Sequence, residues 1–175
     1  MSVDLLNNDF WVRKATAAFR RLDLNKDGTL SRDDMKIFQE RAVQLANMTP
    51  HQIEVFAKKN AELIALSFGD NDHHITLEEF LSVNSKNADQ IGTSTIPDMM
   101  FDIIDTDNDG EISAHEYAVF FQIVGFDQKL VPEAFQAIDA DKDGTISRKE
   151  FADAYVEYCK GTDESHPSRH MFGHM

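Results

Sequence analysis

A twelve-residue segment that occurs three times constrains the fold of this chain more than any other feature. The copies DLNKDGTLSRDD, DTDNDGEISAHE and DADKDGTISRKE begin at Asp23, Asp105 and Asp139, and they align without gaps around a glycine at the sixth place. Apolar residues flank each copy at helical spacing, as Phe19 and Leu22 do before the first. Repeats of this kind mark one supersecondary unit used several times. The pattern therefore predicts repeated helix–loop–helix units.

The second and third copies match the residue pattern of an EF-hand calcium loop. Ca²⁺ takes about six to eight oxygens, and such a loop supplies them from places 1, 3, 5, 7, 9 and 12. We expect place 7 to bind through its backbone carbonyl, place 9 directly or through a water, and place 12 with both carboxylate oxygens. The predicted ligands are Asp105, Asp107, Asp109, Glu111, Ser113 and Glu116 in one loop, and Asp139, Asp141, Asp143, Thr145, Ser147 and Glu150 in the other.

The first copy differs from the other two at its last ligand. Its predicted ligands are Asp23, Asn25, Asp27, the carbonyl of Thr29, Ser31 and Asp34. Aspartate at place 12 is one methylene shorter than glutamate, so it reaches an ion less easily with both oxygens. Six-coordination suits Mg²⁺ better than Ca²⁺. We therefore expect three Ca²⁺ sites in the chain, with Mg²⁺ most readily accepted at this first loop.

EF-hands work in pairs, so three good copies call for a fourth. The segment FGDNDHHITLEE, from Phe68 to Glu79, keeps an apolar eighth place at Ile75 and an acid at the twelfth. However, Phe68 stands where the first ligand belongs, and His73 replaces the glycine. We expect this loop to keep the frame of the repeat but not to bind Ca²⁺.

Together these patterns predict a compact all-α protein made of two packed EF-hand pairs, with a short β-bridge between paired loops such as that of Ile112 with Ile146. Helices are expected over 8–22, 32–46, 50–66, 77–88, 97–104, 114–124, 132–138 and 148–160. The polar stretch 85–96 marks the junction between the pairs. The predicted domains are 1–88, 89–160 and a C-terminal tail over 161–175.

Charge and composition narrow the class of ligand. The chain has 31 acidic and 17 basic side chains, a formal charge of −14, which disfavours nucleic acid and anionic membranes and favours cations. Cys159 is the one cysteine, so no intramolecular disulfide can form. No apolar run is long enough to insert in a membrane. We expect a cytoplasmic monomer, with nothing in the sequence that indicates a protein partner.

With these motifs in place, the chain resembles the invertebrate sarcoplasmic calcium-binding proteins and the related calexcitins. The resemblance rests on FWVRKATAAFRRLDLNKDG, on Asp34 closing the first loop, on the damaged second loop and on the ending SRHMFGHM. It implies a buffer or shuttle that exchanges Ca²⁺ and Mg²⁺ through loops one, three and four. It also implies a tail that covers the apolar interior.

Two other functions are considered. A calcium sensor of calexcitin type would change conformation and engage a partner, but sensors line their grooves with methionine, and the seven methionines here are scattered. A light-emitting EF-hand photoprotein would share the layout with its inactive second loop. Those proteins have a cavity rich in Trp, Tyr and His, whereas this chain has one tryptophan, Trp11, which we expect in the core. We expect no enzyme, because no phosphate-binding loop is present.

Overall fold

The computed structural model describes residues 5–68 and 73–173, and the description below is confined to them. Eight α-helices occur in this part of the chain: α1 (Asp9–Leu22), α2 (Arg32–Leu45), α3 (Pro50–Phe68), α4 (Leu77–Asn87), α5 (Ile96–Ile104), α6 (Ala114–Val124), α7 (Val131–Ile138) and α8 (Arg148–Lys160). The short strands are β1 (Thr29–Leu30), β2 (Ile75–Thr76), β3 (Glu111–Ser113) and β4 (Thr145–Ser147). The all-α prediction is confirmed, and no predicted helix boundary moves by more than two residues.

The helices that leave the loops all begin in the same way. A serine or threonine at the N-cap and an acidic residue three places later form a capping box, as Ser113 and Glu116 do at the start of α6. The same box opens α2, α4 and α8. Because the box satisfies backbone donors that a helix start leaves unpaired, the loop sequence itself sets where each exit helix begins.

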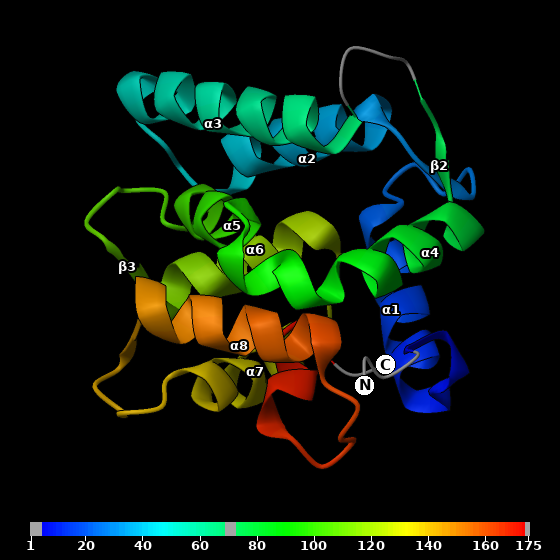
Figure 1. The fold of residues 1–175 in the computed structure, drawn as a ribbon. Helices are drawn as coiled ribbons and strands as arrows, with labels where there is room; N and C mark the ends of the chain where they lie inside the picture. The colour runs from blue at the N-terminus through cyan, green and yellow to red at the C-terminus, as the bar shows by residue number, and fades with distance from the viewer. Residues whose placement is uncertain (1–4, 69–72, 174–175) are drawn as a thin grey trace.

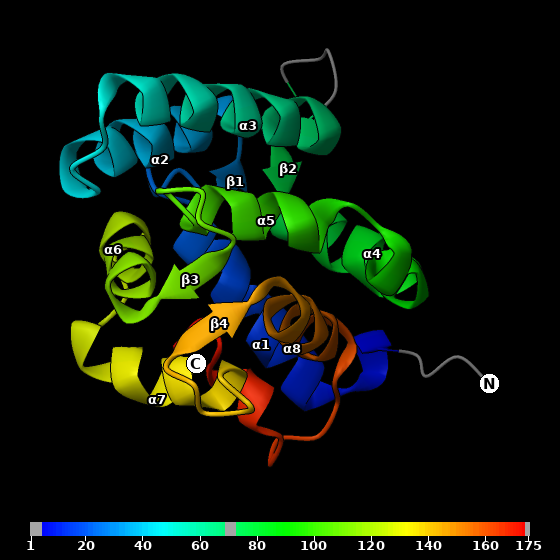
Figure 2. The same cartoon turned by 90° about the vertical axis from the view of Figure 1, so that its left-hand side faces the viewer.

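Two antiparallel strand pairs join the loops two by two. Leu30 of β1 faces Ile75 of β2, and Ile112 of β3 faces Ile146 of β4 as predicted. Figure 2 shows the two strand pairs as separate ladders. In Figure 1 the β2 end and the β3 end of the molecule lie on opposite sides, with α2 and α3 stacked above α5 and α6, and α7 and α8 below. The degenerate second loop therefore still pairs with the first loop.

One apolar cluster crosses from the first half of the chain to the second. Phe38 of α2 stacks on Phe56 of α3 with ring centroids 6.2 Å apart, and both belong to the cluster that contains Phe101 and Phe121. Trp11 is 1% exposed and lies in a smaller cluster beside α4, so its expected core role is confirmed. The division at residues 88 and 160 stays a prediction.

The expected junction is more ordered than its composition indicates. Within the polar stretch 85–96, a 3₁₀ helix η2 (Ala88–Thr93) follows α4 directly and packs against α8. Ala88 is buried there. Three further 3₁₀ helices occur in the described residues: η1 (Leu5–Asn7), η3 (Gln128–Leu130) and η4 (Pro167–His170).

The C-terminal tail packs onto the body of the protein. Met171 is fully buried, and its carbonyl accepts a hydrogen bond from the phenol of Tyr117. The guanidinium of Arg21 donates to the carbonyl of Phe172 at 2.6 Å. The tail thus contacts α1 in the first half of the chain and α6 in the second. Among the described helices, none is long and apolar enough to cross a membrane.

Candidate metal centre

Two of the loops gather three carboxylates at one point. In the loop between α5 and α6 these are Asp105, Asp107 and Asp109, and one oxygen of each lies within 4.8 Å of the others. In the loop between α7 and α8, Asp139, Asp141 and Asp143 are arranged in the same way. Oxygens bound to opposite sides of one Ca²⁺ lie roughly 5 Å apart, because each sits about 2.3–2.6 Å from the ion. Both triads therefore have the span of a single coordination sphere.

The first aspartate of each of these loops has an oxygen without a hydrogen-bond donor. Oδ2 of Asp105 accepts from the amide of Gly110 at 3.2 Å, and Oδ2 of Asp139 accepts from Gly144 at 3.2 Å. The Oδ1 atoms of Asp105 and Asp139 are buried and find no donor among the described residues. A buried carboxylate oxygen without a partner is costly. A cation is the group that would satisfy it, so the donor set fits a bound Ca²⁺.

The glutamate at place 12 bridges the start and the end of each of these two loops by hydrogen bonds. Oε1 of Glu116 accepts from the amide of Thr106 at 2.9 Å, near the start of its loop, while Oε2 accepts from the amide of Ser113 at 2.9 Å, near its end. Glu150 makes the equivalent bonds to the amides of Ala140 and Ser147, both at 2.9 Å. Each oxygen has at least one more donor: Oε1 of Glu116 also accepts from the amide of Asp107, and Oε2 from the hydroxyl of Ser113. Both glutamates are thus held across their loops by hydrogen bonds to both ends.

The backbones of the three intact loops share one unusual conformation. Positive φ occurs at place 4, with Lys26 at 61°, Asn108 at 60° and Lys142 at 61°. It occurs again at the glycine of place 6, where Gly28, Gly110 and Gly144 have φ of 87°, 93° and 94°. Left-handed backbone at two places turns the chain back on itself, so that side chains at places 1, 3 and 5 point to a common centre.

The first loop differs in how its acids are occupied. Both oxygens of Asp23 accept hydrogen bonds, Oδ1 from the amide of Asp27 at 3.1 Å and Oδ2 from that of Gly28 at 2.9 Å. Asp34 is fully buried, and its Oδ1 accepts from the amide of Leu24 at 2.8 Å. Its Oδ2 accepts from the amide of Ser31 at 2.8 Å. Aspartate therefore makes in this loop the same kind of backbone hydrogen bonds that Glu116 makes in its own.

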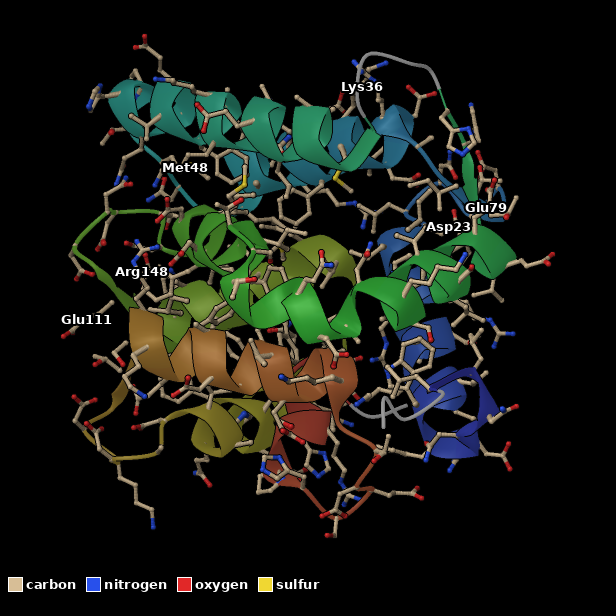
Figure 3. The ribbon with its side chains drawn as sticks, in the orientation of Figure 1. Asp23, Lys36, Met48, Glu79, Glu111 and Arg148 are labelled. Carbon is tan, nitrogen blue, oxygen red and sulfur yellow. The ribbon has the colours of Figure 1, made fainter. Side chains whose placement is uncertain are left out.

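The degenerate second loop can be described from His73 onward, and the positions of Asp70 and Asp72 lie outside the described residues. Oε2 of Glu79 accepts from the amide of Thr76 at 2.9 Å, as its counterparts do. The other oxygen, Oε1, lies 3.5 Å from Nε2 of His73, which stands in place of the glycine. In Figure 3 Glu79 and Asp23 of the paired loop lie on one side of the molecule, and Glu111 lies on the opposite side. Glu79 thus lies near an imidazole side chain at the place where the other three loops have a glycine.

The remaining predicted ligands lie where the loops become strands. Thr29, Glu111 and Thr145 are the first residues of β1, β3 and β4. Ser31, Ser113 and Ser147 have a second role that ligand spelling does not describe, since each caps its exit helix. The signal for this role is present in the sequence as Ser followed three residues later by an acid.

Burial and charge act together on the first aspartate of the third loop. Burial raises the pKa of Asp105, and the neighbouring carboxylates of Glu116 and Asp109 raise it further. The same repulsion that favours protonation favours a cation, because either one neutralises the cluster. A metal ion and a proton would therefore compete for this cluster.

The tie between α5 and α8 holds the two loops of this pair in register. Nη2 of Arg148, the first residue of α8, lies 2.5 Å from Oδ1 of Asp102 on α5. Its guanidinium stacks over the ring of Phe101, 4.3 Å from the centroid. The labelled side chain of Arg148 lies on the same side of the molecule as Glu111 in Figure 3. The entry helix of one loop is thus bound to the exit helix of the other.

Comparison with known proteins agrees with this geometry. Models described as an EF-hand domain pair match residues 98–156 and 71–123, and one described as an EF hand matches 16–39. A sarcoplasmic calcium-binding protein from Hediste diversicolor is 29% identical over 132 residues, which cover 71% of this chain and 75% of the relative. A luciferin-binding protein from Renilla reniformis is 29% identical over 128 residues, 67% of each chain.

A solved structure extends the likeness to the whole fold. The calcium-loaded apo form of a coelenterazine-binding protein from Renilla muelleri superposes with a TM-score of 0.85 and covers all of both chains, at 24% sequence identity. At that identity the match concerns the fold. The family models, the relatives and the carboxylate triads agree on one assignment. The chain is an EF-hand calcium-binding protein, and it is similar to the sarcoplasmic calcium-binding proteins.

Proposed function

We propose that this protein is a cytoplasmic Ca²⁺ buffer or shuttle that loads three ions, through the loops beginning at Asp23, Asp105 and Asp139, and that Mg²⁺ occupies the first loop at rest. The observation that carries the proposal is the pair of unsatisfied buried oxygens, Oδ1 of Asp105 and Oδ1 of Asp139. For the first loop, support comes from its backbone, which repeats that of the other two.

The arrangement of the tail favours buffering over sensing. A sensor must uncover an apolar surface for its target when Ca²⁺ binds. Here Met171 is buried and its carbonyl is bound by Tyr117, while Phe172 packs its ring on Tyr158 with centroids 4.9 Å apart. The tail of this chain therefore lies on the kind of apolar surface that a sensor would offer to its target protein. We propose binding without catalysis, in a monomer, with no protein partner required.

Calorimetric counting of bound ions tests the three-site proposal. We expect three Ca²⁺ for the wild type and two each for Glu116→Gln and Glu150→Gln, because a neutral amide cannot replace a bidentate carboxylate. Glu79→Gln is the matched control, since it makes the same change in the degenerate loop, and it should still bind three. A wild-type count of two or four would contradict the site assignment.

Hydrogen exchange of the tail separates buffer from sensor. The amides of residues 168–173 should be equally protected in the Mg²⁺-loaded and the Ca²⁺-loaded protein if the tail remains in place. A loss of protection that is specific to Ca²⁺ would mean that the tail is released, and the protein would then be a sensor whose target takes that surface.

A further inference from the structure

An apolar cavity lies among the helices, and none of its lining residues belongs to a metal loop. It has a volume of about 140 Å³ and is lined by residues of α1, α4, α5, α6 and α8 and by Phe172 of the tail. An apolar cavity of about 150 Å³ engineered into another protein stays dry and binds benzene. The space in this protein is therefore large enough for one aromatic ring.

Seven of the fifteen residues that line this cavity are aromatic, and their rings come from distant parts of the chain. Trp11 on α1, Phe80 on α4 and Phe120 on α6 all line it. Ring faces and edges of this kind favour an aromatic guest, because offset and edge-to-face contacts add to the free energy of burying its surface.

Lys14 is the one charged side chain among the described residues that line the cavity. It is 3% exposed, and its ammonium donates a hydrogen bond to the carbonyl of Gly161 at 2.7 Å. The same ammonium lies 5.1 Å from the ring centroids of Phe10 and Tyr158. No carboxylate of the described residues comes within 4.0 Å of it. Buried lysines are rarely left without a counter-ion.

Burial lowers the pKa of Lys14 to about 8, and the nearby Cys159 and Glu157 limit that fall. At neutral pH the side chain is therefore still mostly charged. An ammonium of this kind retains two further donors beyond its bond to Gly161. It thus offers both a charge and free hydrogen bonds to a guest that carries an acceptor anion.

We infer that the cavity binds a small amphiphilic carboxylate, whose aromatic body lies among the rings and whose anionic head pairs with the ammonium of Lys14. A neutral aromatic molecule of the same size would fill the space but leave the lysine without a counter-ion. An amine would be repelled. This site is separate from the proposed buffering of Ca²⁺, although Leu22 both lines the cavity and directly precedes Asp23.

Three compounds with one skeleton test the inference: 4-phenylbutyrate, 4-phenylbutanol and 4-phenylbutylamine. Trp11 is the single tryptophan of the chain and lines the cavity, so its fluorescence reports occupancy directly, and calorimetry gives the affinity. With protein saturated in Ca²⁺, we expect the carboxylate to bind at least about tenfold more tightly than the alcohol, because hydrogen bonds to charged groups are the stronger ones. The amine should bind most weakly.

Two variants assign the two halves of the site. Lys14→Met keeps the length of the side chain but removes the charge, so the tenfold preference should disappear while ring binding remains. Ala18→Phe places a ring in the cavity from α1, and it should abolish binding of all three compounds. Where Lys14→Met does not fold, the head-group series on the native chain and the filled cavity of Ala18→Phe still decide.

Several outcomes would overturn the inference. Equal affinity of the native protein for all three compounds would show that Lys14 does not select the head group. A carboxylate preference that survives in Lys14→Met would place the anion elsewhere. Unchanged Trp11 fluorescence and no heat at millimolar concentrations of any compound would mean that the cavity takes no guest of this size.

Discussion

Ile112 and Ile146 face each other across the antiparallel pair β3–β4, and both side chains are fully buried. Each occupies the eighth place of its own loop, between the carbonyl at place 7 and the capping serine at place 9. A change in the backbone of one loop therefore reaches the other through this pair of side chains and through the hydrogen bonds between β3 and β4. The two loops are expected to bind Ca²⁺ as a coupled pair.

Replacing Ile146 by alanine tests this coupling. The substitution removes buried methyl groups from the bridge, and we expect it to lower the free energy of unfolding by about 2–5 kcal/mol. It should also weaken Ca²⁺ binding in both loops, although it changes no ligand. Calorimetry and chemical denaturation measure the two effects. Ile75→Ala is the control, because Ile75 lies in the other bridge, and it should leave these two sites unchanged.

The positive φ of the loop glycines leads to a second prediction. Gly144 has φ of 94°, and a Cβ built there would meet no atom within 4 Å. Gly144→Ala is therefore penalised by backbone conformation and not by a clash, at a cost of about 1–2 kcal/mol for a left-handed residue with a side chain. We expect weaker Ca²⁺ binding at this loop, seen by titration. Gly92→Ala, whose Cβ would meet only Val156 at 3.8 Å, should bind Ca²⁺ like the wild type.

Much of the fold follows from the residue pattern of the loops. Spacing between the glycine, the apolar eighth place and the acidic twelfth place predicts the exit helices, and Pro50 predicts the start of α3. The pairing of Ile112 with Ile146 follows from the same register. These features are local in sequence, so one repeat contains all the information that sets them.

Features that depend on distant residues are not predictable in the same way. The 3₁₀ helix η2 lies in a polar stretch without periodicity, and it is ordered because Ala88 is buried against the body of the protein. The cavity is a property of many side chains at once. Lys14 nevertheless has a signal in the sequence: it lies three residues after Trp11 and four before Ala18, on the face of α1 that is buried.

A third prediction concerns the seal between the tail and the body. Tyr117 is fully buried, and its hydroxyl donates to the carbonyl of Met171, 54 residues away in sequence. Tyr117→Phe removes the hydroxyl alone and leaves a buried carbonyl unpaired, at a cost of about 1–3 kcal/mol. Hydrogen exchange of the tail amides should become faster. Tyr158→Phe makes the same change where the hydroxyl bonds to none of the described residues, so it should leave tail exchange unchanged.

The buried lysine predicts how stability depends on pH. Because burial lowers the pKa of Lys14 from its ordinary 10.5 to about 8, the unfolded chain binds more protons than the folded one between these values. The contribution of Lys14 to the free energy of unfolding must then rise with pH across that window. Relative to Lys14→Met, the wild type should gain stability from pH 7 to pH 9 in denaturation experiments.

The matched control for that experiment is Lys149→Met. Lys149 is exposed, and its hydrogen bond and ion pair with Asp153 raise its pKa above the ordinary 10.5. A raised pKa gives a contribution that is complete below 10.5, so this variant should run parallel to the wild type from pH 7 to pH 9. If the stability curves of Lys14→Met and the wild type were also parallel over this range, the ammonium of Lys14 would be solvated in the folded protein.

The short acid at the end of the first loop leads to the last prediction. Asp34 is fully buried and holds the amides of Leu24, Asn25 and Ser31. Glutamate at this place would bring its carboxylate one methylene closer to the ion, as in the other two loops. Because Ca²⁺ accepts more oxygens at longer distances than Mg²⁺ does, Asp34→Glu should raise the preference of this loop for Ca²⁺ over Mg²⁺ by roughly tenfold or more. Titration with Ca²⁺ in the presence of millimolar Mg²⁺ measures the change, and Glu116→Asp should shift the third loop in the opposite direction. If Asp34→Glu leaves the competition between the two ions unaltered, the identity of the twelfth residue does not set the metal, and the proposal that Mg²⁺ occupies this loop at rest loses its basis.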